Sequence, residues 1–119
     1  MIFNYIRVST IDQNTTRQLI DVPCDREYID KASGKDAKRP ELQNMLNNLR
    51  ENDLVNVHSL DRLCRNVKDL LNIVETIQSK GATIKFHKEN LTFGPNKEDP
   101  LNKAIMTIIG AIAELERNL

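Results

Sequence analysis

The strongest constraint on the fold of this chain is the repeated alternation of short strand patterns with longer helical patterns. Residues 2–8 alternate two sets of side chains, and residues 54–57 form a compact apolar run. Residues 67–77 instead carry apolar side chains three and four positions apart, which is the spacing of one helix face. Strands that alternate with helices predict an α/β domain built on a mostly parallel central sheet flanked by helices.

The remaining segments fit the same plan. Thr10 and Asp12 are capping residues for a helix that is expected to end at Val22, because Pro23 stops it. Pro40 suits the first position of another helix. The other expected elements are, in chain order, a strand over 27–30, a polar loop over 31–39, a helix over 40–49, a strand over 82–86 and a loop over 91–99.

The last segment differs from the others in how its apolar residues are spread. Asp99 and Pro100 supply a cap and a first position for a helix that runs to Leu119. Its apolar side chains cover more of the circumference than one core contact needs. Such a helix is either buried in its own domain or shared between subunits, and the small size of the chain favours sharing. The apolar set is Ile105, Met106, Ile108, Ile109, Ile112 and Leu115.

Composition narrows the class of protein. The length of 119 residues predicts one domain. The 17 Lys and Arg are balanced by 17 Asp and Glu, which argues against a basic surface that binds nucleic acid nonspecifically. Cys24 and Cys64 have neither disulfide nor zinc spacing, which favours a reducing, cytoplasmic setting. No apolar run approaches the roughly 20 residues that cross a bilayer, so no membrane partner is expected.

Common cofactor and metal motifs are absent from the sequence. It has no glycine-rich dinucleotide or phosphate loop, no paired histidines at metal spacing and no Cys-x-x-Cys. His58 and His87 adjoin apolar strand patterns and are interpreted as ordinary half-buried or surface histidines. The sequence therefore predicts a protein without a cofactor or a metal ion.

One serine and several arginines follow the predicted strands. Ser9 comes at the carboxyl end of the first strand, two residues after Arg7, and Asp61, Arg62 and Arg65 follow the strand over 54–57. Parallel strands bring their carboxyl ends to one edge of the sheet. Guanidinium groups match the oxygens of a phosphorus transition state, so this set suits phosphoryl transfer. A capping serine with surface arginines explains the spacing equally well.

Four separated blocks carry a resemblance to a known family. They are YIRVSTIDQN at 5–14, DKASGKDAKRPEL at 30–42, HSLDRLCRN at 58–66 and AIAELER at 111–117. In this order they resemble the catalytic domain of the serine recombinases, the resolvase and invertase family of site-specific DNA recombinases. The resemblance covers essentially the whole chain.

The resemblance implies that Ser9 is the nucleophile. Its hydroxyl would attack a DNA phosphodiester, release a 3′ hydroxyl and form a 5′-phosphoserine link, followed by strand exchange and religation. Asp61 would orient an arginine or donate a proton to the leaving oxygen. The arginines implied to grip the scissile phosphate are Arg7, Arg39 and Arg62, and Arg65 matches the second catalytic arginine in the sequence block of Arg62.

Other positions are implied to support the site or the assembly. Tyr5, Gln13 and Gln18 match the shell around the serine, and Glu116 and Arg117 match a pair on the helix through which members dimerise and then tetramerise. Ile105, Ile108, Ile109 and Ile112 are expected to form that subunit contact. Two positions depart from the family: Asn48 replaces a basic residue for which Arg50 is a candidate substitute, and Cys64 replaces a common glycine.

The implied organisation is a catalytic core over 1–99 and the start of a dimerisation helix over 100–119, with the family's DNA-binding helix-turn-helix domain absent from this chain. The implied partners are a DNA recombination site and further copies of the chain, as a homodimer and as a tetramer in the synaptic complex. The expected location is the cytoplasm, in association with the nucleoid. The alternative is a noncatalytic module that uses the same fold for DNA synapsis or assembly.

Overall fold

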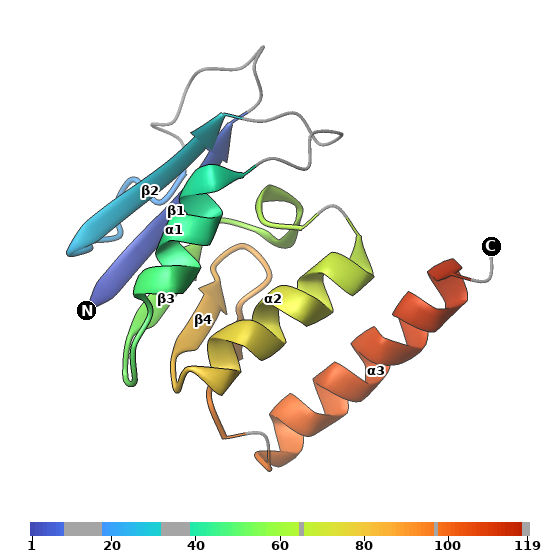
Figure 1. The fold of residues 1–119 in the computed structure, drawn as a ribbon. Coiled ribbons are helices and arrows are strands. Elements are labelled where there is room, and N and C mark those ends of the chain that lie inside the picture. Colours follow the sequence, from blue (N-terminus) through green and yellow to red (C-terminus); the bar gives the residue numbers. More distant parts are fainter. Residues whose placement is uncertain (9–17, 32–38, 65, 97, 118–119) are drawn as a thin grey trace.

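A computed structural model describes residues 1–8, 18–31, 39–64, 66–96 and 98–117 of the chain, except for the side chains of 113 and 115–117. Its central feature is a five-stranded sheet in the order β2-β1-β3-β4-β5 (Figure 1). The first four strands are parallel, and β5 runs antiparallel to β4. The predicted α/β class with a mostly parallel sheet is therefore confirmed. The strands are β1 (Ile2–Val8), β2 (Arg26–Lys31), β3 (Leu54–Val57), β4 (Thr83–Phe86) and β5 (Leu91–Phe93).

Three α-helices and one short 3₁₀ turn complete the described structure. Helices α1 and α2 lie over the same face of the sheet, and α3 lies alongside α2 (Figure 1). The 3₁₀ turn η1 follows β3 at its carboxyl end. The bounds are α1 (Pro40–Asn48), η1 (Leu60–Arg62), α2 (Val67–Ser79) and α3 (Pro100–Arg117).

The alternation of side chains along β1 divides the core into two parts. Phe3 and Tyr5 point into the main core beneath α1 and α2, where both are almost fully buried. Ile6 and Val8 point to the opposite face and pack with Leu19. This is the two-sided arrangement that the strand pattern predicts.

The opposite face also holds a row of hydrogen-bonded polar side chains. His87 Nε2 lies 2.8 Å from Asn56 Oδ1, Asn56 Nδ2 donates to Asn4 Oδ1 at 3.1 Å, and Asn4 Nδ2 donates to the Val22 carbonyl at 2.9 Å. Burial lowers the pKa of His87, and Lys85 and His58 add to this effect. His87 is thus a half-buried histidine that belongs to a structural hydrogen-bond network, as its place after an apolar strand indicated.

The helix expected over Thr10–Val22 does not extend through its last residues. Residues 10–17 lie outside the described residues, whereas 18–22 form a bend and a turn. Leu19 adopts a positive φ of 55°, which interrupts a right-handed helix. Hydrogen bonds from Gln18 to the Arg7 carbonyl and from Asn4 to the Val22 carbonyl tie this segment to β1. Tertiary contacts therefore override the local helical pattern here.

The loop expected over 91–99 contains a short strand instead. β5 pairs with β4 through Phe93 opposite Ile84 and Leu91 opposite Phe86. The rings of Phe86 and Phe93 pack edge to face, with centroids 6.3 Å apart. Asn90, with a φ of 55°, supplies the left-handed residue that closes the turn between the two strands.

The two later helices begin where the sequence predicts, and α2 also ends near Gly81 as expected. Asn66 caps α2 by accepting the Asp69 N–H at 2.8 Å, and Gly81 follows the end of α2 with a φ of 76°. A Cβ at Gly81 would lie 2.6 Å from Glu51 Cγ, so glycine is required there on two counts. Asp99 Oδ1 accepts the N–H of Leu101 at 2.9 Å and so caps α3.

The apolar residues of α3 divide between two environments. Ile109 is buried, and Ile105 and Met106 pack against the same core. Ile108 and Ile112 are 60% and 43% exposed. The helix thus packs on its own domain through one side and presents apolar side chains on another. Among the described residues, no helix is long and apolar enough to cross a membrane.

Candidate active site

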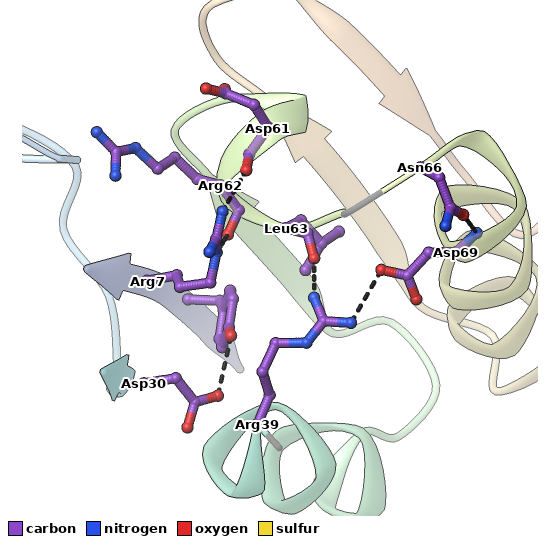
Figure 2. A network of polar contacts seen from close by, with 9 residues as sticks. Arg7, Asp30, Arg39, Asp61, Arg62, Leu63, Asn66 and Asp69 are labelled. Atoms are coloured by element: carbon purple, nitrogen blue, oxygen red, sulfur yellow. Dashed lines mark hydrogen bonds and ion pairs between the residues drawn. The ribbon is translucent and has the colours of Figure 1, made fainter. Parts of the chain in front are cut away.

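A group of arginines and aspartates gathers where β1, η1 and the start of α1 meet (Figure 2). Arg7 comes from the end of β1, Arg62 from η1, and Arg39 is the residue directly before α1. The structure therefore brings together three of the four arginines that the sequence assigned to the site. Arg65 lies outside the described residues.

Two of these arginines bind three successive backbone carbonyls. Arg7 donates from Nη2 to the Asp61 carbonyl at 2.6 Å and from Nε to the Arg62 carbonyl at 3.1 Å. Arg39 donates from Nη1 to the next carbonyl, that of Leu63. The Leu63 side chain is fully buried in the main core. These contacts fix the backbone of the segment that carries Arg62.

Arg62 itself is placed differently from the other two arginines. Its half-buried side chain extends away from the network in Figure 2. Its guanidinium makes no hydrogen bond or ion pair with any residue that the structure describes. Because its backbone is held on both sides and its side chain is not, Arg62 is available to bind an anion at this edge of the sheet.

Arg39 is paired with an aspartate that the sequence analysis did not identify. Its Nη2 lies 2.9 Å from Asp69 Oδ2 in the first turn of α2. The Arg39 side chain is only 8% exposed. Nothing in the periodicity of the sequence links positions 39 and 69. The sequence does place Asp69 three residues after the capping residue Asn66, and this spacing indicates a position in the first turn of α2 but not a pairing with Arg39.

A second unpredicted aspartate, Asp30 of β2, organises the base of the site. It is buried and accepts the Tyr5 hydroxyl at 2.9 Å together with the backbone N–H groups of Glu41 and Leu42 at 3.0 and 2.9 Å. Asp30 therefore caps α1, since Arg39 at the N-cap position makes no side-chain cap of its own. Burial raises the pKa of Tyr5 well above its usual range, and Asp30 adds to the shift.

The carboxylate of Asp61 stays close to its own turn. It accepts the Ser59 hydroxyl at 2.5 Å. This hydrogen bond lowers the pKa of Asp61, and the nearby Arg62 and Lys88 add to the shift. A lowered pKa keeps Asp61 ionised at neutral pH.

Gln18 is the other supporting residue whose place is described. Its Nε2 donates to the Arg7 carbonyl at 3.0 Å, two residues before Ser9. Ser9 and Gln13 lie outside the described residues. Of the residues predicted to surround the nucleophile, the structure thus describes Tyr5, Arg7 and Gln18.

The Cys64 thiol directly follows Leu63, whose carbonyl binds Arg39. Burial raises the pKa of the Cys64 thiol to about 12, so its reactive thiolate is scarce at neutral pH. Among the described residues, no three His, Cys, Asp or Glu side chains come together as a metal-binding group.

Asn48 and Arg50 lie far from this site. Asn48 is the last residue of α1, whereas Arg39 directly precedes its first residue. The Asn48 amide donates to the Tyr28 hydroxyl at 3.1 Å, and the Arg50 N–H donates to Asp53 at 2.8 Å. In this arrangement neither residue takes part in the arginine group.

The fold and the motifs agree with a family match. A family model described as "Resolvase, N terminal domain" matches residues 2–119. The chain belongs to this family, and the family resemblance inferred from the four sequence blocks is confirmed.

Individual relatives support the assignment. The chain is 50% identical over 115 residues to the Tn21 transposon resolvase of Escherichia coli and 44% identical over 115 residues to the Tn501 transposon resolvase of Pseudomonas aeruginosa. These alignments cover 97% of this chain and 61% of each resolvase. The crystal structure of the N-terminal catalytic domain of TP901-1 integrase has the same fold, with a TM-score of 0.75 and 24% identity over 98% of this chain and 96% of that one.

Proposed function

We propose that this chain is the catalytic domain of a site-specific DNA recombinase with Ser9 as its nucleophile. The Ser9 oxygen attacks a DNA phosphorus, the bond from phosphorus to the 3′ oxygen breaks, and a 5′-phosphoserine link forms. The serine proton is lost and the 3′ oxygen gains one, so the step balances without an oxidant or an energy source. Attack of a 3′ hydroxyl on the phosphoserine reverses the step and rejoins a strand.

The segment 61–63 carries the proposal, because Arg7 and Arg39 bind its backbone carbonyls and Arg62 belongs to it. Three guanidinium groups suit the negative charge that spreads over the nonbridging oxygens of the phosphorus. The same contacts hold the backbone of Arg62, which supports its part in the proposed site. Arg65 belongs to the same proposal because it shares the sequence block of Arg62.

The remaining site residues act on these arginines and on the serine. Ser59 keeps Asp61 ionised, which favours the orienting role of Asp61 over proton donation to the leaving oxygen. Gln18 holds the Arg7 carbonyl, and Tyr5 joins β1 to β2 through Asp30. Gln13 is assigned to the shell around Ser9 on the family motif.

A hybrid protein tests the function directly. Residues 1–119 would replace the matching part of the Tn21 resolvase, and the hybrid would be given DNA carrying that resolvase's recombination site with a nick beside the scissile phosphate. We expect a denaturant-stable protein–DNA product and, after digestion, a phosphorylated peptide that contains Ser9. Ser9→Ala should yield none. The proposed nucleophile is wrong if the unsubstituted hybrid forms no product or if Ser9→Ala still forms it.

The alternative function is a noncatalytic module that holds DNA-bound partners together. The exposed apolar residues Leu101, Ile108 and Ile112 on α3 favour it, because an assembly surface needs no chemistry. It predicts that Ser9→Ala hybrids pair two DNA sites normally while the unsubstituted hybrid never cleaves them. The retained arginine group favours the recombinase.

We also propose that α3 carries the subunit contact of a homodimer and of a synaptic tetramer, with the catalytic core over 1–99 and the helix from 100 onward. Ile105 and Ile109 already pack on their own domain, so Ile108 and Ile112 are the residues of the predicted set that remain for a second copy. The side chains of Glu116 and Arg117 lie outside the described residues. The helix-turn-helix domain would read the recombination site.

Ile108→Asp should weaken this association without unfolding the domain. Ile108 is 60% exposed, so aspartate costs little in the monomer, whereas burying its charge at an apolar contact should raise the dissociation constant at least about tenfold. Sedimentation velocity over a concentration series would measure the change. Thr107→Asp, which adds the same charge at the neighbouring exposed position, is the control. An unchanged mass distribution for a folded Ile108→Asp protein would argue against the contact.

A further inference from the structure

The environment of Arg39 conflicts with the task that the proposed function gives it. Its side chain is 8% exposed, yet a scissile phosphate arrives from solvent. Nη1 is bound to the Leu63 carbonyl and Nη2 to the Asp69 carboxylate, as Figure 2 shows. Each terminal nitrogen keeps one further N–H, but the side chain is almost fully buried, so a phosphate from solvent reaches these donors only if Arg39 leaves its present acceptors.

The third nitrogen of Arg39 is left without an acceptor. Nε is buried and has no hydrogen-bond partner among the described residues. A buried donor without an acceptor is unfavourable, because it has lost its hydrogen bonds to water and forms none in the protein. An anion with two oxygens can bind Nε and Nη2 together, since guanidinium donors lie in a planar fork. The present pairing with Asp69 uses only one of the two.

From these contacts we propose that Asp69 is a positioning residue that retains Arg39 in a buried resting state and sets how readily Arg39 engages the scissile phosphate. The inference rests on the proposed function, because it assigns Arg39 to the phosphate. It adds a competition between two anions, the Asp69 carboxylate and the phosphate, for one guanidinium group.

The neighbourhood of Asp69 makes this exchange possible. The Asp69 side chain is 17% exposed and helps to line a groove of about 280 Å³ between α1 and α2. Side-chain amides of Gln43, Asn47 and Asn72 line the same groove. Water occupies about 30 Å³ per molecule in the liquid, so the groove has room to hydrate the carboxylate after Arg39 leaves.

Asp69 is also held firmly enough to act as a fixed partner. It lies in the first turn of α2, where its backbone N–H donates to Asn66 Oδ1 at 2.8 Å. Arg39 in contrast directly precedes α1, so its side chain can change its course without disturbing a helix. In the proposed exchange the arginine is therefore the member of the pair that moves.

Asp69→Asn in the hybrid protein tests the proposal. Asparagine keeps an oxygen near Arg39 but removes the negative charge. A hydrogen bond to a charged group is stronger than one to a neutral group, and the difference in free energy corresponds to roughly a tenfold change in rate. We expect the covalent product on nicked DNA to form about tenfold faster. Glu27→Gln removes one negative charge at an exposed position of β2 and should leave the rate unchanged.

Two further measurements separate positioning from a general structural effect. In an Arg39→Ala background, Asp69→Asn should no longer change the rate, because the restrained group is gone. Phenylglyoxal, which modifies accessible guanidinium groups, should label Arg39 of the isolated chain faster in Asp69→Asn than in the unsubstituted protein. Peptide mapping would identify the labelled arginine.

Each outcome decides the proposal separately from the function. If the unsubstituted hybrid forms the Ser9-dependent product but Asp69→Asn forms it at the same rate or more slowly, the function stands and the restraint is wrong. An equal effect of Asp69→Asn with and without Arg39 also overturns it. Should Asp69→Asn fail to fold by circular dichroism, Asp69→Ser takes its place. Failure of both to fold would overturn the proposal, because a pair that the fold requires cannot open during each reaction.

Discussion

Arg62→Ala is expected to slow formation of the covalent product by about 10³-fold while the free energy of unfolding stays within about 0.5 kcal/mol. Removing one positioned donor from a charged transition state typically costs this much in rate. The stability should hold because the Arg62 guanidinium contacts no described residue through a hydrogen bond or an ion pair. Single-turnover cleavage of nicked DNA by the hybrid and urea unfolding of the isolated chain would measure the two quantities.

The other two arginines provide the contrast. Arg7 and Arg39 bind backbone carbonyls of the 61–63 segment, so their alanine variants should lose stability as well as rate. Arg62→Lys is the matched control, since it keeps the charge but loses the planar fork, and it should fall between wild type and Arg62→Ala. An Arg62→Ala rate within threefold of wild type would remove Arg62 from the proposed chemistry.

Asp30→Ala is expected to lower the free energy of unfolding by about 3 kcal/mol, which corresponds to a fall of about 12 °C in the melting temperature of a domain of this size. The Asp30 side chain is buried and accepts three hydrogen bonds, one from Tyr5 and two from the first turn of α1. Without it, a buried hydroxyl and two backbone N–H groups lose their acceptor. Thermal and urea unfolding monitored by circular dichroism would measure the loss.

Asp25→Ala is the matched control for Asp30→Ala. Asp25 precedes the same strand and accepts one backbone hydrogen bond, from Ile2 at 2.7 Å, but at an exposed position. Water can replace that acceptor, so the expected loss is below about 1 kcal/mol. Equal losses for the two variants would contradict the structural role assigned to Asp30.

The fold was largely predictable because the spacing of apolar residues and the capping residues indicate most of its elements. β1 and β3 match their expected bounds, and α1, α2 and α3 begin at their expected first residues. Two expectations were wrong. Residues 18–22 bend because Gln18 and Asn4 bind partners on neighbouring segments, and β5 forms because β4 offers it an edge. Both depend on contacts between segments, which a local pattern does not contain.

The residues of the site also differ in whether a local pattern or a contact between segments reveals them. Arg7 and Arg62 were predictable because each stands near the carboxyl end of a parallel strand. Arg39 came only from the family motif, and its described position beside Leu63 agrees with that grouping. Asp30 and Asp69 were missed, since their roles arise from pairings across 11 to 30 residues. The residues that hold the site together were therefore less visible than the residues that act in it.

Arginines and aspartates occur in equal number in the described part of the site, and this balance has a consequence for the encounter with DNA. Three positive charges on Arg7, Arg39 and Arg62 stand beside three negative charges on Asp30, Asp61 and Asp69. Such a set produces almost no field beyond a Debye length, about 10 Å at 0.1 M salt. These six side chains therefore add little to the counterions released on DNA binding or to the attraction of a distant duplex. Ionic strength should govern how the DNA-reading part of a recombinase finds its site, and leave the chemical step in this domain nearly untouched.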